Sequence, residues 1–158
     1  MRDRSIVPAG YHRVSPYLRV DRVVEAIAFY EAVLGAVECI RFENTKGKIG
    51  YSELKLGEAT IMMGADGGIE NSQQHGDSNS SLYVFVDDVD KVVHKAKAAG
   101  AQILEPPEDK FYGDRTASFK DPYGHSWTVA THFEDVTMEE LKSRGAVHGM
   151  ILKKYKMQ

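Results

Sequence analysis

The chain has 158 residues, enough for one domain with a substantial buried core. Its 23 acidic residues exceed its 20 lysines and arginines by only three, and no dense basic run occurs beyond Lys153-Lys154, so nucleic acid is not expected as a partner. No apolar run approaches the length of a membrane span, the N-terminus lacks a signal-peptide pattern, and the one cysteine, Cys39, cannot form an internal disulfide. A cytoplasmic protein without a membrane partner is therefore predicted.

The first half of the chain predicts one helix among four strands. After a loose N-terminal arm, residues 13–20 alternate like a strand, Asp21 is a good helix N-cap, and apolar residues follow at helical spacing until Gly35. Three further strands are predicted, over residues 37–42, 49–56 and 59–63.

The beginning of this unit occurs a second time. Residues 15–21 read SPYLRVD and residues 81–87 read SLYVFVD, with Ser, Tyr, Val and Asp at matching positions. Self-similarity of this kind indicates two copies of one supersecondary unit. Any site between the copies is then expected to use equivalent positions of both.

A polar connector leads into the second unit, which repeats the pattern. A strand over 82–86 precedes a helix capped by Asp87 or Asp88 and ended by Gly100. Three further strands are predicted over residues 101–104, 115–119 and 126–131, and the first of them stops at Pro106-Pro107. A type I turn is predicted over 121–124. A C-terminal helix is predicted to begin with a capping box at Thr137.

Short motifs in the second unit add to the repeat: FYGDR at 111–115, DPYGHSW at 121–127, ATH at 130–132 and EDV at 134–136. Together with the repeat they resemble the vicinal oxygen chelate superfamily, which includes glyoxalase I, extradiol dioxygenases and the fosfomycin and bleomycin resistance proteins, and within it the PhnB-like branch.

The resemblance implies an α+β fold. Two tandem βαβββ modules would form a curved, half-closed mixed sheet around a cleft, with the helices outside. A single domain would then span residues 1–158, with module one at about 13–64, a connector at 65–80, module two at about 81–132 and the C-terminal helix at about 138–145. A homodimer is the default assembly for such a protein.

In metal-dependent members of this superfamily four side chains from the first and last strands of each module hold a metal. The resemblance places these positions on Ser15, Met62, Ser81 and Thr128. Hydroxyls and a thioether are poor ligands for Ni, Zn, Fe or Mn, and none of the six histidines has a spacing that builds a substitute site. No metal and no other cofactor is therefore expected.

Strand alternation predicts which side chains line the cleft. It selects Ser15, Tyr17, Arg19, Tyr51, Glu53, Met62, Ser81, Tyr83, Phe85 and Thr128, while the opposite faces are apolar and should pack under the helices. Arg19 either clamps a carboxylate or phosphonate of a ligand or pairs with Glu53 across the sheet.

Three residues are candidates for proton transfer: Tyr112, Asp114 and Glu53. Gly113 permits a bend that would bring Tyr112, Asp114 and Arg115 together at the cleft mouth, where Tyr112 would donate to an oxyanion and Asp114 would act as a base or orient Arg115. The alternative is a local Asp114–Arg115 salt bridge that only fixes the loop.

The leading functional prediction is a protein that binds a small organic molecule between its modules without a metal. Whether it is also an enzyme stays open. The alternatives are a divalent-metal-dependent glyoxalase-like lyase, isomerase or dioxygenase, a metal-free enzyme that uses Tyr112 or Asp114, and a drug-sequestering protein.

Overall fold

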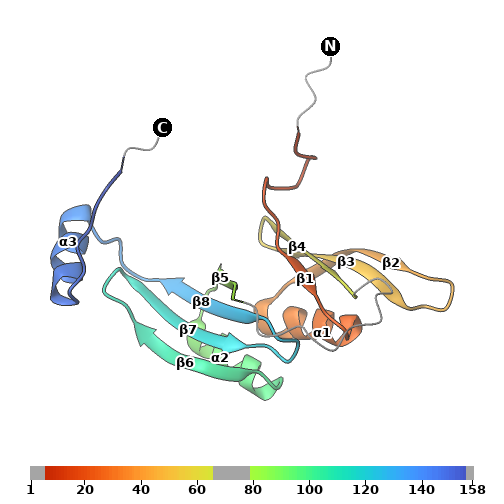
Figure 1. The fold of residues 1–158 in the computed structure, drawn as a ribbon. Coiled ribbons are helices and arrows are strands. Elements are labelled where there is room, and N and C mark those ends of the chain that lie inside the picture. Colours follow the sequence, from red (N-terminus) through yellow and green to blue (C-terminus); the bar gives the residue numbers. More distant parts are fainter. Residues whose placement is uncertain (1–5, 66–78, 156–158) are drawn as a thin grey trace, which may run out of the picture.

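The computed structural model describes residues 6–65 and 79–155, and these form two modules of the same topology (Figure 1). The first holds β1 (Tyr17–Arg19), α1 (Val23–Leu34), β2 (Val37–Glu43), β3 (Ile49–Leu56) and β4 (Ala59–Gly64). The second holds β5 (Ser81–Phe85), α2 (Val89–Ala98), β6 (Gln102–Asp109), β7 (Asp114–Lys120) and β8 (Ser126–His132), and α3 (Met138–Val147) follows it.

Each module contains a four-stranded mixed sheet, with strand orders β1-β4-β3-β2 and β5-β8-β7-β6. In both sheets the first strand runs parallel to the last, and the remaining pairs are antiparallel. The predicted α+β fold of two βαβββ modules is confirmed. Most of the connector predicted at 65–80 lies outside the described residues.

The helix ends follow the predicted capping chemistry with one exception. Gly35 ends α1 in a left-handed conformation with φ of +71°, Asp88 caps α2 by accepting a bond of 3.0 Å from Lys91 N–H, and the capping box of Thr137 is present. The prediction for Asp21 was wrong, because α1 begins after Arg22 without a side-chain cap.

Strand β6 is longer than predicted, since it continues through Pro106-Pro107 to Asp109. Proline has no N–H to donate, which a central strand does not tolerate. Strand β6 lies at the edge of its sheet, and its pairing with β7 shifts register between Glu105 and Glu108. The edge position and the irregularity together accommodate both prolines.

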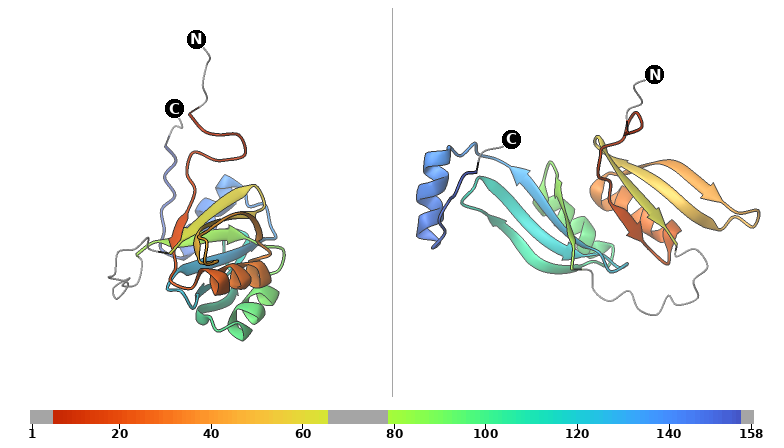
Figure 2. Two further views of the ribbon diagram at one scale, coloured as in Figure 1. Left: turned by 90° about the vertical axis from the view of Figure 1, so that its right-hand side faces the viewer. Right: turned by 45° about the horizontal axis from the view of Figure 1, so that its top comes forward.

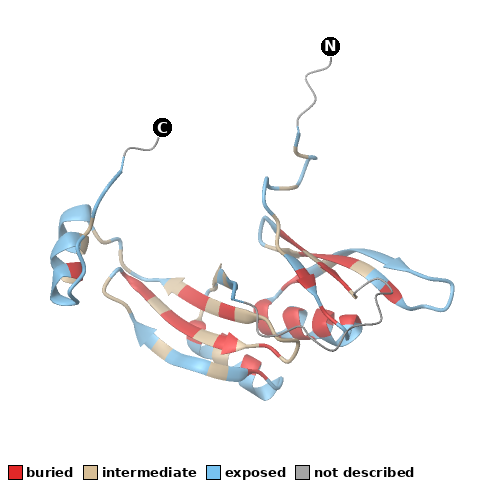
Figure 3. Ribbon diagram, viewed as in Figure 1, coloured by how far each residue is buried: buried red, intermediate tan, exposed pale blue. Residues whose placement is uncertain are grey.

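The apolar side of each sheet packs against the helices, as the alternation predicted. Figure 3 shows buried residues on α1 and along β7 and β8. A single buried cluster extends through both modules. It includes Val20, directly after β1, and the strand residues Leu18, Leu54, Ile61, Met63, Ala117, Phe119, Trp127 and Val129. Leu56, Leu82, Val84 and Val86 are partly buried beside it.

The carboxylate of Asp121 joins the two modules. Its side chain is almost wholly buried and accepts hydrogen bonds from the Tyr30 hydroxyl at 2.6 Å and the Trp127 indole N–H at 2.8 Å. The backbone N–H groups of Tyr123 and His125 add bonds of 2.9 Å each to its other oxygen. Burial and then the neighbouring Asp121 raise the pKa of Tyr30 well above its ordinary value. Asp121 therefore opens the predicted turn and also anchors α1.

Helices α1 and α2 lie on one side of the two sheets, and the N-terminal arm and the chain after α3 extend on the other side (Figures 1 and 2). The sheet surfaces away from α1 and α2 are called the open faces of modules one and two. No helix in the described part of the chain is long and apolar enough to cross a membrane.

Replacing Tyr30 with Phe is expected to lower the free energy of unfolding by about 1.5–3 kcal/mol, because it removes one donor from a buried carboxylate. The matched control is Tyr123→Phe, which removes a hydroxyl from the same aromatic cluster without touching a bond to Asp121. Urea denaturation of both variants measures the difference. Equal losses in the two variants would contradict the role given to the Tyr30–Asp121 bond.

Candidate functional site

The open face of module one carries a row of aromatic side chains. The rings of Phe42 and Tyr51 lie 6.2 Å apart, and those of Tyr51 and Tyr17 lie 6.1 Å apart. A Cβ atom at position 64 would lie 2.5 Å from the Tyr17 hydroxyl, so Gly64 makes room for this ring. Phe42 and Tyr17 stay exposed, which leaves an aromatic surface available for contact.

Glu53 is the buried carboxylate of this face. It accepts a bond of 2.6 Å from the Tyr11 hydroxyl and one of 2.7 Å from the Tyr51 hydroxyl. The ion pair between Arg19 and Glu53, one of the two roles predicted for Arg19, is not among the contacts of Glu53 within the described residues, where Tyr11 and Tyr51 bind the carboxylate. Sequence reasoning missed Tyr11, which lies in an arm without periodicity.

One cavity borders the open face of module one, and another lies between module one and the first strand of module two. One, of about 590 Å³, lies between the N-terminal arm and the sheet and is lined by Ile6, Val7, Pro8, Tyr11, His12, Arg13, Ser15, Glu53 and Met62. The other, of about 620 Å³, lies where the β3–β4 turn meets β5, and its lining includes Pro16, Leu56, Ala59, Ile61, Ser81, Leu82, Tyr83, Val84, Phe85 and Trp127. The second cavity is mainly apolar.

The open face of module two carries a different cluster, built from facing residues of β7 and β8. Asp114 pairs with His132 in the sheet register, and its carboxylate lies 2.7 Å from His132 Nδ1. His132 Nε2 lies 2.8 Å from Asp135, and the Tyr83 hydroxyl donates to Asp114 at 3.4 Å. Tyr112 belongs to the same end of the module, since only Gly113 separates it from Asp114 in the chain.

Charge in this cluster favours the protonated imidazole. Hydrogen bonds to Asp114 and then to Asp135 raise the pKa of His132 above its ordinary value. Burial, followed by the neighbouring Tyr112 and Asp114, raises the pKa of Tyr83. Because both imidazole nitrogens face carboxylates, the cluster can hold a proton and present phenol hydroxyls to a ligand.

Gly113 and α3 hold this cluster in place. Gly113 has φ of +93°, and a Cβ there would lie 2.1 Å from the carbonyl oxygen of Glu134, so only glycine fits. Arg144 of α3 binds the Glu134 carboxylate through two bonds of 2.6 and 2.8 Å. The ring of Phe111 stacks on His148 at 4.9 Å. The predicted capping box marked this helix, but nothing in the sequence showed where it docks.

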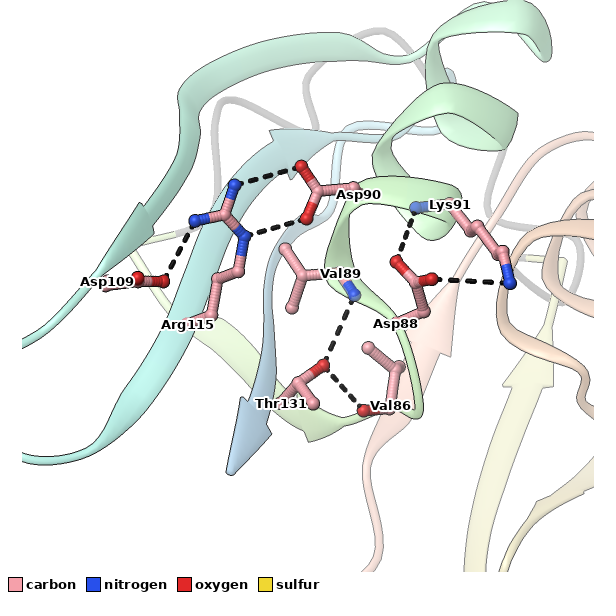
Figure 4. A network of polar contacts seen from close by, with 8 residues as sticks. All are labelled: Val86, Asp88, Val89, Asp90, Lys91, Asp109, Arg115 and Thr131. Atoms are coloured by element: carbon pink, nitrogen blue, oxygen red, sulfur yellow. Dashed lines mark hydrogen bonds and ion pairs between the residues drawn. The ribbon is translucent and has the colours of Figure 1, made fainter. Parts of the chain in front are cut away.

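Arg115 does not join Tyr112 and Asp114, so that part of the prediction was wrong. It lies on the helix side of β7, where its guanidinium binds Asp90 at 2.7 and 3.0 Å and Asp109 at 2.9 Å (Figure 4). Neither the predicted Asp114–Arg115 salt bridge nor the orienting role of Asp114 is present. Arg115 ties α2 to β6 and β7 instead.

The four positions at which the resemblance expects metal ligands lie in different surroundings. Ser15 and Met62 border the cavity under the arm, Ser81 borders the other one, and the Thr128 hydroxyl lies 3.0 Å from that of Ser118. Within residues 6–65 and 79–155, no group of three or more His, Cys, Asp or Glu side chains is arranged to hold a metal ion. The four side chains do not fit the superfamily's metal.

His132 is expected to titrate above its ordinary value of about 6.5, and Asp114→Asn should lower its pKa more than Asp135→Asn. The reason is that Asp114 is the larger cause of the shift and is nearly buried, whereas Asp135 is fully exposed. Stability gained from the charged imidazole should be complete below about pH 6.5 and disappear as the pH rises through the raised pKa. NMR titration of the imidazole gives the values, and equal shifts in the two variants would contradict the assignment.

The comparisons with known proteins agree with this architecture. The sequence model of the Glyoxalase/Bleomycin resistance protein/Dioxygenase superfamily matches residues 10–129. An uncharacterized protein of Mycobacterium bovis is 30% identical over 142 residues, covering 86% of this chain and 93% of that protein. Among solved structures, a glyoxalase/bleomycin resistance protein/dioxygenase family enzyme from Burkholderia phytofirmans is 26% identical, with a TM-score of 0.60 over 76% of this chain and 96% of that one.

A PhnB protein from Bacillus cereus is 21% identical, with a TM-score of 0.62 over 76% of this chain and 99% of that one, which shows a shared fold. The family model and the Mycobacterium relative carry the assignment further, because they extend over most of the sequence. The chain therefore belongs to the glyoxalase/bleomycin resistance protein/dioxygenase superfamily.

Proposed function

We propose that this protein binds a small organic molecule on the open faces of its two modules and does so without the superfamily's metal. The observation that carries the proposal is the set of residues at the four metal positions, Ser15, Met62, Ser81 and Thr128, in a chain whose fold is otherwise intact. A serine or threonine hydroxyl does not replace an imidazole or carboxylate ligand, and a methionine thioether is too soft for these metals.

The chemistry of the open faces supports an organic ligand. Tyr17 is 52% exposed, Tyr83 49% and Phe85 65%, so aromatic rings are available for packing. The carboxylates of Glu53 and Asp114 lie beside them and give each face a polar end. Ligand sites typically combine apolar walls with a few placed polar groups.

We assign the protein to the PhnB-like branch as part of this proposal. Two observations support the assignment. The combination of the motifs FYGDR, DPYGHSW, ATH and EDV resembles this branch, and the PhnB protein of Bacillus cereus shares the fold over most of its length.

A metal-free enzyme is the second candidate, and the contact between Asp114 and His132 favours it. A carboxylate held by an imidazole on one oxygen and by the Tyr83 hydroxyl on the other can pass a proton between a ligand and the cluster. Tyr112 is partly exposed beside them, at 37%, and can donate to an oxyanion. Here the roles of Tyr112 and Asp114 are those predicted from the sequence, with His132 in the place expected for Arg115.

Purified protein is expected to contain no stoichiometric metal, and incubation with Ni, Zn, Fe or Mn is expected to leave its melting temperature unchanged. Elemental analysis and thermal unfolding measure the two quantities. A screen of small amines, acids and aromatic compounds by the same thermal assay should then identify ligands that raise the melting temperature. NMR spectra of each such ligand with the protein show whether it is converted to a product. One tightly bound metal per chain would overturn the metal-free proposal, and a product that His132→Gln no longer forms would favour the enzyme.

We also propose a homodimer in which a second copy packs beside the ligand surfaces, in contact with the exposed ring of Phe85. Charge supports this pairing, because Glu105 lies on the edge strand β6 of module two, while Arg13 borders the open face of module one. Complementary charge of this kind favours association of like chains in opposite orientation.

Light scattering is expected to give twice the chain mass of 17.6 kDa. Phe85→Asp should weaken the dimer by about tenfold or more, because it places a charge in a desolvated aromatic contact. Val24→Asp is the matched control, since Val24 is an exposed apolar residue on the helix side. A monomer at all concentrations, or equal weakening in both variants, would contradict the proposal.

A further inference from the structure

We propose that the cavity between the N-terminal arm, residues 6–16, and the open face of module one binds a small organic cation such as a protonated amine, with Glu53 as its counter-ion. The inference rests on the proposed function, because it names the ligand class for one of the two open faces. It uses the contacts of Glu53, the aromatic walls and the position of the arm.

The first step is the state of Glu53. Only 8% of the residue is exposed, and glutamate is rarely buried unless it is paired. Both side chains that bind it, Tyr11 and Tyr51, are neutral phenols, and no lysine or arginine of the described residues forms an ion pair with it. A carboxylate has about four acceptor sites, and two are filled. A positively charged donor is the group that best uses the others.

The second step concerns Lys55, whose ammonium group is bound away from Glu53. Lys55 follows Glu53 on the same face of β3, but its ammonium donates to the Gly10 carbonyl and the Thr60 hydroxyl. The same ammonium lies 5.4 Å from the centre of the Tyr11 ring. The arm therefore already places one cation over an aromatic ring, and it uses the lysine for its own attachment and not for Glu53.

The third step is the lining of the cavity. Tyr11, Met62 and the apolar residues Ile6, Val7 and Pro8 can enclose the carbon skeleton of an amine, and an aromatic ring attracts an ammonium group over its face. The volume of about 590 Å³ lies within the range of small-molecule sites. His12 and Arg13 border the same cavity but are exposed. Solvent therefore screens their repulsion of a bound cation more than it screens the attraction between that cation and the buried Glu53.

The test uses the two adjacent methionines of β4 as reporters. Met62 borders the cavity, whereas Met63 faces the core and is 0% exposed. Protein labelled with ¹³C at the methionine methyl groups is titrated with benzylammonium, benzyl alcohol and benzoate, which share one skeleton and differ in charge. The Met62 methyl signal, assigned with Met62→Leu, is expected to shift and saturate with benzylammonium alone, while the Met63 signal stays in place.

Glu53→Gln keeps the size and one acceptor oxygen of the side chain and removes its charge, so it should weaken benzylammonium binding about tenfold or more. Glu31→Gln, which removes a carboxylate from the exposed side of α1, should leave the affinity unchanged. The position of the Met63 signal shows whether each variant keeps the core.

Three results would overturn the inference: no shift of Met62 with benzylammonium, an equal affinity in Glu53→Gln with an intact core, or equal binding of benzyl alcohol. Binding of benzoate or benzyl alcohol in place of benzylammonium would reject the cation and still leave a small-molecule binder. The charge series is measured on the wild-type protein, so the inference can fail even if Glu53→Gln does not fold.

Discussion

The carboxylate of Asp121 accepts four hydrogen bonds in a nearly dry environment, and two of them come from different modules. Tyr30 belongs to α1 of module one, and Trp127 belongs to β8 of module two. A buried carboxylate destabilises a fold unless its oxygens are satisfied, so each donor is needed where it lies. Because α1 is packed on one sheet and β8 is part of the other, this carboxylate fixes how the two sheets are placed. The relative position of both open faces follows from it.

The two copies of the repeat pack in the same way on the helix side but make different side-chain contacts on the open side. Leu18 and Val84, at equivalent positions, both pack against the core. Tyr17 and Tyr83 are also equivalent, yet Tyr17 lies over Gly64 while Tyr83 reaches Asp114. Packing against a helix allows few side chains, whereas an exposed sheet surface carries no such constraint. The open faces could therefore acquire separate chemistry on one scaffold.

Strand alternation predicted which residues face the helices, as Trp127 shows, but it did not predict that Glu53 on the opposite side is buried as well. It did not predict the contacts between distant segments, because no spacing rule links Tyr30 to Asp121, which lie 91 positions apart. The error at Arg115 has a simpler cause. Residues 112–115 were interpreted as a bend, although β7 already begins at Asp114, and alternation from that residue sends Arg115 to the helix side. The edge position of β6 could not be predicted from the local sequence either, because it depends on the order of the strands in the sheet.

In both modules the ionisable groups lie beside the positions at which the superfamily places metal ligands, and they bind one another. Glu53 pairs across the sheet with Met62, and phenols occupy it. On the other face, Tyr83 pairs with Thr128 and reaches the carboxylate that holds His132. A metal site needs several carboxylate or imidazole ligands gathered at one point, and within the described residues no group of three or more such side chains is arranged in this way. What the faces still offer is charge, hydroxyl donors and aromatic surface, and these are the means by which proteins recognise organic molecules.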